Sequence, residues 1–446
     1  MKRALVFLAV IFAVALAIRM TPFFWENRPI GLDSYYHMRM AAGFVDGLPV
    51  YDSLSYGGRP YEYPPGIHVL LSFMPEAAPI IITLIGAMAV LSVFLLAREI
   101  YNEKVALVAS FLIAFMPVHI WKTSSNVLVT AVDMTLLILA CYFLARKDTA
   151  KYFSISLLIF MFSPAISVLS LLLYIPSMRK DSKSILVVAA IIIEASAAYL
   201  LYGSAISIYA GTLPYDISSA LFENIGVADV LYRLTPFLIP LSVLGLYMSR
   251  KNASRPVLLW LAVILVLFVA GKIETDRGLA YMAVPMSVLS AHAIASIKRK
   301  EIVVIILAAT AITGIYSLNS LRWGIVTDDE YSALTWIKEN TPKDSVILAQ
   351  FLEGHWVSGI AERKNIADPN LIGAPAAERL EDILSAYRNQ SQKEILSRYS
   401  VSYILYTERA PQVGARPEYF PYKEVFRSGN VRVFEVTSSS SPREAR

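Results

Sequence analysis

The sequence predicts a polytopic α-helical membrane protein with a small α/β domain at its C-terminal end. Of the 446 residues, 56% are hydrophobic and only 17% are charged, whereas about a quarter of the residues in a soluble domain are charged. The apolar residues are grouped in blocks of about 16–22, the length at which a helix spans the hydrocarbon core of a bilayer. After residue 319 the pattern changes to short amphipathic segments.

The apolar blocks predict the membrane-spanning helices in order. We expect them at 4–19, 77–97, 104–118, 127–145, 152–175, 185–202, 235–249, 256–271, 277–296 and 301–319. Pro164 lies in the middle of the block 152–175, whose two flanks are both basic, and proline breaks the interior of a helix. We therefore expect a tight hairpin in this block, which raises the total to about eleven helices.

Lys and Arg residues at the ends of these blocks predict the orientation. The basic loops are "REIYNEK", "ARKDTAK", "SMRKDSK", "SRKNAS" and "IKRK". Because cytoplasmic loops are enriched in Lys and Arg, we expect these loops and the N-terminus in the cytoplasm, in a multi-pass protein of the cell membrane. The net charge of +5 therefore indicates a lipid bilayer, and not nucleic acid, as the partner. The single cysteine, Cys141, excludes a disulfide framework.

The same orientation predicts the domains. We expect residues 1–319 to form the transmembrane domain, with external loops at 20–66, 119–126 and 204–234. Downstream, "DDEYSALTWIKEN", "LEDILSAYRN" and "QKEILSRY" read as helices, and "VSYILYT" and "VRVFEV" read as strands. Residues 320–436 are therefore expected to form a small external α/β domain, followed by a disordered Ser-rich tail at 437–446.

The first external loop gathers polar and aromatic side chains in "GLDSYYHMR" and "YGGRPYEYPPGIHVLL". Asp33 suits the capping of a helix over 34–44, but it could instead be a carboxylate held at the membrane surface for chemistry. His37 follows one turn later and shares its helix face. A rigid, charged loop near lipid suits a pocket for an amphipathic substrate, and its candidate binding residues are Tyr36, Arg39, Arg59 and Tyr63.

These two stretches resemble the first external loop of the catalytic subunit of oligosaccharyltransferase, a GT-C membrane glycosyltransferase. Further similar stretches follow in the same order, namely "SSNVLVTAVDMTLLILACYFLAR", "DRGLAYMAVPMSVLSAHA" and "ALTWIKENTPKDSVIL…GHWVSGIAERKNIAD". The resemblance implies a GT-C fold and transfer of a sugar from a polyprenyl-linked donor, with inversion, to a lipid-linked glycan or a protein.

The sequence departs from that family at the signature that reads the hydroxyl residue of an asparagine sequon. The family has Trp-Trp-Asp-Tyr-Gly, and the aligned residues here are Gln350, Phe351, Leu352, Glu353 and Gly354. A pocket built to hydrogen-bond a hydroxyl loses that recognition when its Asp becomes Leu, so we expect an acceptor other than the sequon. His355 and Trp356 follow the signature and are further candidates for substrate binding.

The second acidic motif of the family is also altered. Val129 and Ala131 stand where the family has metal-binding carboxylates, and Asp133 lies one step deeper. A hard divalent cation needs several oxygen ligands, to which Asp33 and His37 could contribute together with an acid of the 204–234 loop, Glu223 or Asp229. This leaves Mg²⁺ or Mn²⁺ open as a cofactor without requiring either.

A mechanism without metal needs one base and one or more cations. Asp33 is the candidate general base for the acceptor hydroxyl. Arg277 is the leading candidate for the departing phosphate, because Arg binds phosphate bidentately; Lys122, Arg233 and Arg59 are further candidates. Each of these cations could instead anchor lipid headgroups.

Three other functions stay open on the sequence. One is protein glycosylation like that of oligosaccharyltransferase itself. Another is a transporter or flippase, because Glu194 lies in an apolar block and an acid within the membrane is costly. The third is a non-catalytic scaffold that binds lipid-linked sugar, which the altered motifs allow.

Overall fold

The computed structural model describes residues 2–436 except 26–27, 48, 125, 176–188, 191, 195, 198–199, 201–225, 250–254, 271–272, 274 and 373. The chain divides into two compact units. The described residues of the helical unit belong to 1–30, 64–212 and 221–323. Those of the second unit, which we call the sheet unit, belong to 31–63 and 324–446.

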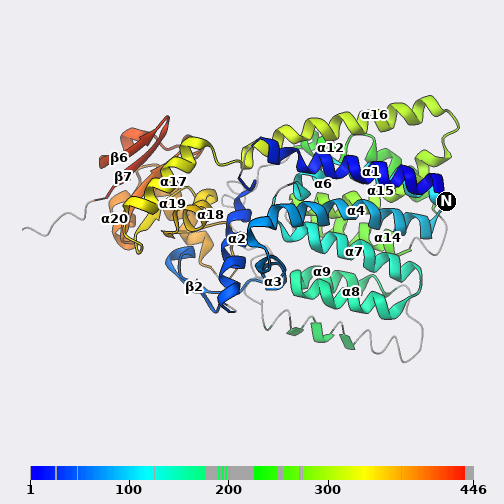
Figure 1. The fold of residues 1–446 in the computed structure, drawn as a ribbon, viewed down its shortest axis with the longest axis horizontal. Helices are drawn as coiled ribbons and strands as arrows, with labels where there is room; N and C mark the ends of the chain where they lie inside the picture. The colour runs from blue at the N-terminus through cyan, green and yellow to red at the C-terminus, as the bar shows by residue number, and fades with distance from the viewer. Residues whose placement is uncertain are drawn as a thin grey trace, which may run out of the picture. The chain divides into compact units, whose positions relative to one another are not determined.

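The helical unit is a bundle of apolar helices (Figure 1). Its helices are α1 (Lys2–Met20), α3 (Gly66–Ser72), α4 (Ala78–Ile100), α5 (Glu103–Ala114), α6 (Pro117–Thr123), α7 (Val129–Ala145), α8 (Thr149–Phe162), α9 (Pro164–Leu172), α12 (Val227–Leu234), α13 (Leu238–Met248), α14 (Arg255–Val269), α15 (Thr275–Ser296) and α16 (Lys300–Tyr316). Helix α15 is central, since 89% of its apolar window is buried, against 22% for the segments that contain α1 and α16. Small residues let helices approach closely, and a Cβ on Gly245 of α13 would lie 2.0 Å from the Leu289 carbonyl oxygen of α15.

Over the described residues, four helical segments are long and apolar enough to cross a membrane, and two bent helix pairs raise the number to six. Helices α7, α8 and α14 are apolar but shorter. The prediction of a helical membrane protein is therefore confirmed, whereas the number of about eleven spans stays a prediction. The expected span at 185–202 lies largely outside the described residues.

The hairpin expected at Pro164 is confirmed. Helix α8 ends at Phe162 and α9 begins at Pro164, and the two helices lie side by side (Figure 1). The hydroxyls of Ser156 and Ser170 are 2.7 Å apart, and these residues are equally far in sequence from Ser163, so the arms are antiparallel. The proline ends one arm because it has no N–H for the preceding turn.

A buried arginine holds the corner between α5 and α6, which meet at an angle of 63°. Pro117 at the start of α6 cannot donate to the last carbonyls of α5. The Arg19 guanidinium replaces that donor, with hydrogen bonds of 3.0 Å to the Ala114 carbonyl and 2.8 Å to the Thr123 hydroxyl. The corner therefore has a fixed shape, and it carries the helix on which Lys122 lies.

The sheet unit confirms the expected small α/β domain. Its sheet has the order β4-β3-β5-β7-β6, with β3 parallel to β4 and β5, and with β7 antiparallel to β5 and β6. Its main elements are α2 (Leu32–Gly43), α17 (Asp328–Asn340), β3 (Val346–Leu348), α18 (Gly354–Trp356), β4 (Lys364–Asn365), α19 (Ala376–Tyr387), α20 (Gln392–Arg398), β5 (Val401–Tyr406), β6 (Lys423–Ser428) and β7 (Val431–Glu435). The short strands β1 (Tyr51–Asp52) and β2 (Arg59–Pro60) pair separately. The expected tail, 437–446, lies outside the described residues.

The loop that contains α2 belongs to the sheet unit, whereas the sequence assigned it to the transmembrane domain. The physical reason is packing. Tyr35 of α2 is part of the same core as Trp356 and Val357. Gly359 permits this contact, because a Cβ there would lie 2.8 Å from the Tyr35 Cβ.

Candidate active site

Asp33 lies in the first turn of α2, with 43% of its side chain exposed. The capping residue of this helix is Gly31, with φ of +88°, and no side chain caps the helix. The interpretation of Asp33 as a cap is therefore wrong. Its carboxylate remains accessible, and the helix N-terminus favours its negative charge.

A buried histidine lies directly behind Asp33. His355 Nε2 is 3.5 Å from Asp33 Oδ1, and on the other side of the ring Nδ1 is 3.6 Å from Asp368 Oδ1. The imidazole is 1% exposed and stacks on the Tyr36 ring with centroids 5.1 Å apart. Burial lowers the pKa of His355 below its ordinary value, although the charges of Asp368 and Asp33 act in the opposite direction.

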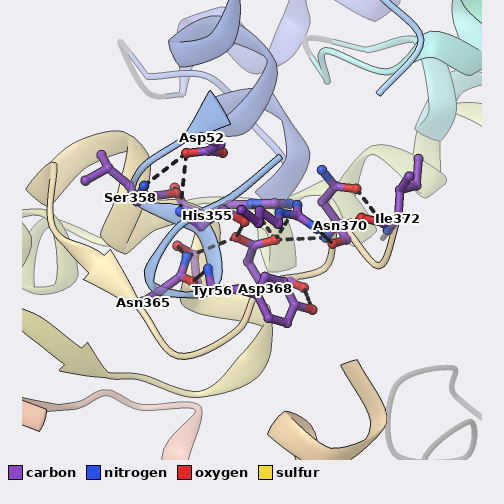
Figure 2. Close-up of polar contacts among 12 residues, drawn as sticks. Asp52, Tyr56, His355, Ser358, Asn365, Asp368, Asn370 and Ile372 are labelled. Carbon is purple, nitrogen blue, oxygen red and sulfur yellow. Dashed lines mark hydrogen bonds and ion pairs between the residues drawn. The ribbon is translucent and has the colours of Figure 1, made fainter. Parts of the chain in front are cut away.

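Asp368 is held by a dense set of donors, shown in Figure 2. The Ser55 hydroxyl donates to its carboxylate at 2.6 Å, the Asn365 amide at 3.0 Å and the Asn370 backbone N–H at 3.0 Å. The Tyr56 hydroxyl donates to the Asp368 carbonyl at 2.7 Å. Asp368 is fully buried, and a buried carboxylate needs such donors. Asp368 could not be identified from the sequence, because Ser55 and Tyr56, two of its donors, lie more than 300 residues before it in the chain.

Two arginines expected to bind substrate are engaged within the sheet unit. Arg39 binds Asp52 with two hydrogen bonds of 2.8 and 2.6 Å. Although burial raises it, the hydrogen bonds and charge of Arg39 hold the pKa of Asp52 below its ordinary value. Arg59 donates to the carbonyls of Asn370 and Ile372, each at 2.8 Å, and lies over the Tyr56 ring. Both arginines therefore stabilise the loop that carries Asp33.

The aromatic residues of the first loop form a cluster. The Tyr36 ring contacts His37 and Tyr63 edge-on at 5.2 and 5.7 Å, and His37 contacts Tyr63 at 5.1 Å. Tyr36 and His37 are each 2% exposed. The cluster therefore supports α2 from one side, and it leaves Asp33 as the accessible polar group of the motif.

The donors expected for Mg²⁺ or Mn²⁺ do not fit a metal centre here. His37 is buried among aromatic rings, and the described residues contain no group of three or more His, Cys, Asp or Glu side chains that could hold a metal ion. Asp229 accepts the Gly226 N–H at the start of its own helix. Glu223 lies outside the described residues. We therefore derive no step through a metal.

Four of the five residues aligned with the sequon signature are buried, and Leu352 is half-buried. Trp356 is fully buried and packs under Arg409, whose guanidinium carbon lies 4.4 Å from the ring centroid. Glu353 is also fully buried and accepts a hydrogen bond from Thr407. We therefore do not retain Trp356 as a substrate-binding residue.

A second group of candidate residues lies in the helical unit, where two cations that the sequence analysis named separately lie near the same carboxylate. Lys122 Nζ of α6 is 3.9 Å from Asp276 Oδ2, and Arg233 of α12 pairs with Asp276 Oδ1. Both cations lie over the Trp121 ring, at 5.3 and 4.6 Å. Arg277 is the next residue of α15. We call Lys122, Arg233 and Asp276 the cation cluster; its two positive charges and one negative charge suit an anion.

The two acids inside the bundle have hydroxyl partners. The Tyr281 hydroxyl donates to Asp133 at 2.6 Å, and Ser167 donates to Glu194. Both acids are nearly fully buried. Hydrogen bonding reduces the cost of burying a polar group, so a structural role explains both.

Comparisons with known proteins were made at three levels. No protein-family model matches the chain, and no curated protein matches its sequence. Solved structures do match. The oligosaccharyltransferase of Archaeoglobus fulgidus, tethered to an acceptor peptide with an NVT sequon, matches with a TM-score of 0.66 and 16% identity, over 94% of this chain and 72% of that chain. AglB from the same organism, with an inhibitory peptide and a dolichol-phosphate, matches with 0.66 and 15%, over 99% and 75%.

ArnT from Cupriavidus metallidurans, bound to undecaprenyl phosphate, matches with a TM-score of 0.60 and 12% identity, over 98% of this chain and 99% of that chain. The chain therefore has the fold of GT-C membrane glycosyltransferases. The resemblance to oligosaccharyltransferase is confirmed at the level of the fold. At these identities the likeness shows the fold alone.

Proposed function

We propose that this protein is a membrane glycosyltransferase that transfers a sugar or glycan from a polyprenyl-phosphate-type donor to an acceptor other than an asparagine sequon. In this proposal the acceptor is a lipid-linked glycan or a protein. The protein is a multi-pass protein of the cell membrane with a cytoplasmic N-terminus, and the sheet unit acts on the outer face.

The observation that carries the proposal is Asp33, an accessible carboxylate supported from behind by a buried histidine. A general base must present a free oxygen to the attacking group. Asp33 does so, while the neighbouring charges of the same loop, Arg39 and Asp52, neutralise each other. The GT-C fold supports the same conclusion.

The reaction that fits is a single displacement at the anomeric carbon. The acceptor hydroxyl oxygen attacks this carbon, and its proton passes to the Asp33 carboxylate. The bond between the carbon and the phosphate oxygen breaks, so polyprenyl phosphate leaves as an anion and the configuration inverts. General-base catalysis of this kind contributes about 10²–10⁴ in rate.

The cation cluster suits the phosphate of the donor. Arg277, the residue after Asp276, can bind phosphate bidentately, and Lys122 and Arg233 are two further cations close to Asp276. Fixed cations stabilise negative charge as it develops on a leaving group. We propose that this cluster holds the lipid phosphate before and during transfer.

The buried signature residues support an acceptor other than a sequon. Leu352 has no group to bind a hydroxyl, and the neighbouring Glu353 carboxyl is fully buried with Thr407 as its partner. A site that lacks the hydrogen-bonding group loses discrimination for the hydroxyl. Protein glycosylation at a sequon is therefore the less favoured function.

The test compares intact lipids extracted from cells with and without the gene. We expect a lipid-linked precursor that is one transfer short to accumulate in the deletion, and purified protein to leave an Asn-x-Thr peptide unmodified. Transfer to that peptide would establish the oligosaccharyltransferase function instead. An unchanged lipid profile would contradict an enzyme and support the scaffold, whereas full complementation by Asp33→Asn would support either the scaffold or a catalytic acid from the 204–234 loop.

A further inference from the structure

We propose that His355 is a positioning residue that holds the Asp33 carboxylate in its reactive orientation, with the imidazole itself held in place by stacking on Tyr36. This inference rests on the proposed function of Asp33. It differs from the expectation that His355 binds substrate, because the ring is 1% exposed. A buried ring can act only through its neighbours.

The contacts of Asp33 carry the first step. Among the residues that the structure describes, His355 is the ion-pair partner of Asp33. Its Nε2 atom lies 3.5 Å from Asp33 Oδ1. Asp33 is on α2 and His355 is on α18, so the two residues are more than three hundred positions apart in the sequence. Helix α18 therefore fixes a side chain that α2 alone would leave to rotate.

The surroundings of Asp368 bear on which nitrogen of the His355 ring carries the proton. Asp368 already accepts hydrogen bonds from Ser55, Asn365 and the Asn370 N–H, and Arg59 Nη2 lies 3.8 Å from its Oδ1. This carboxylate is satisfied without His355, whose Nδ1 makes no hydrogen bond. In this proposal the ring proton is therefore on Nε2, the nitrogen that lies 3.5 Å from Asp33 Oδ1.

The imidazole itself has little freedom. It stacks on Tyr36 at 5.1 Å with an interplanar angle of 26°. The residue before it must be small, because a Cβ on Gly354 would lie 2.1 Å from the Ala367 carbonyl oxygen and 2.6 Å from the Asp368 Cβ. The segment that carries His355 is thus packed against the segment that carries Asp368 (Figure 2). A rigid support of this kind is what orients a reacting group.

The experiment replaces His355 in the full-length protein with three residues of graded reach. His355→Gln keeps an amide N–H near the position of Nε2, His355→Asn keeps one near Nδ1, and His355→Phe keeps only the ring that stacks on Tyr36. We expect Phe and Asn to lower kcat at least about 10-fold with KM unchanged, and Gln to recover most of the loss. Equal losses in all three, or a rise in KM alone, would overturn the assignment.

Two controls separate the outcomes. Val357→Ala removes core volume beside His355 without touching Asp33, so it should lower Tm and leave kcat unchanged. The double variant Asp33→Asn, His355→Phe should be no slower than Asp33→Asn alone. In a separate cycle, the Tm shifts of Asp33→Ala and His355→Phe should not add in their double variant, and additive shifts would show that the side chains do not interact. If wild-type protein transfers no sugar, the proposed function fails, whereas the Tm cycle still decides whether His355 holds Asp33.

Discussion

At the scale of single residues, Asp33 combines an exposed carboxylate with a buried support. The helix dipole at the start of α2 favours its charge by a fraction of 1 kcal/mol. Because Gly31 and not Asp33 caps the helix, loss of the carboxylate should leave the helix intact. Chemistry and stability can therefore be separated at this position.

We expect Asp33→Asn to reduce transfer by about 10² or more, because general-base catalysis contributes at least that factor. Tm should change little, since Asn has the same shape and no capping bond is lost. The measurement is sugar transfer by purified protein beside a thermal unfolding curve. Asp344→Asn is the matched control, an exposed carboxylate of the same unit. A variant with full turnover would refute the role of Asp33.

The motif "GLDSYYHMR" identified Asp33 as a candidate carboxylate from the sequence, but it did not identify the residues that contact Asp33. Ser55 lies about 310 positions before Asp368, to which it donates, and Asp33 lies about 320 positions before His355. Contacts between residues so far apart leave no local pattern in the sequence. His355 and Trp356 were expected to face a substrate because local sequence does not report burial. The cations Lys122, Arg233 and Arg277 were identifiable from their place at the ends of apolar blocks, whereas the grouping of Lys122 and Arg233 around Asp276 required the fold.

At the scale of elements, the short segment that carries the altered signature is a structural turn. The 3-10 turn Phe351–Glu353 is closed by Gln350 and Glu353, since the Gln350 N–H donates to the Glu353 carboxylate at 3.2 Å. Thr407 also donates to this carboxyl. Burial raises the pKa of Glu353 to about 8, against opposing contributions from Thr407 and Arg409, while Glu330 adds to the increase.

This raised pKa predicts that the sheet unit loses stability as the pH rises. The folded state binds the Glu353 proton more tightly than the unfolded state, whose pKa is 4.5. Stability is therefore greatest below pH 4.5 as far as this group is concerned, falls between 4.5 and about 8, and reaches its lower level above that range. Thermal unfolding of purified protein, followed by tryptophan fluorescence between pH 5 and 8, should show Tm decreasing.

Glu353→Gln should flatten this dependence, because Gln keeps the shape without a titrating group. The matched control is Glu394→Gln, whose side chain is 69% exposed on α20 and should leave the slope unchanged. A slope that survives in Glu353→Gln would assign it to another group.

The elements themselves were largely predictable. Helix α17 ends before Pro342 and the hairpin turns at Pro164, because proline acts locally and its effect is visible in sequence. The strands β5 and β7 lie where the sequence predicted strands. That α2 belongs to the sheet unit was not predictable from the sequence, since it depends on the contact between Tyr35 and Gly359.

At the scale of the whole molecule, the basic loops predict one orientation that can be measured with thiol labelling. The chain has a single cysteine, Cys141, which is buried, so Cys141→Ala gives a suitable background. In that background we expect Ala150→Cys to be protected from an impermeant thiol reagent in intact cells and Asp344→Cys to react, because the positive-inside rule places residue 150 in the cytoplasm. Both positions are exposed in the structure.

Detergent-solubilised protein provides the control, in which both cysteines should react. Labelling of Ala150→Cys in intact cells would contradict the predicted orientation, and protection of Asp344→Cys would contradict an external sheet unit.

The sheet unit is discontinuous in sequence, and this has a consequence for biosynthesis. Ser55 donates to Asp368, and Arg59 donates to Ile372, in each case across 313 residues. A ribosome adds about 5–20 residues per second, so the loop with Asp33 waits for tens of seconds before its partners exist. During that time its aromatic residues are available to chaperones and proteases. A chain that ended before the last hundred residues would contain Asp33 without His355 and Asp368. Such a truncated chain is expected to be inactive even if its helical unit folds.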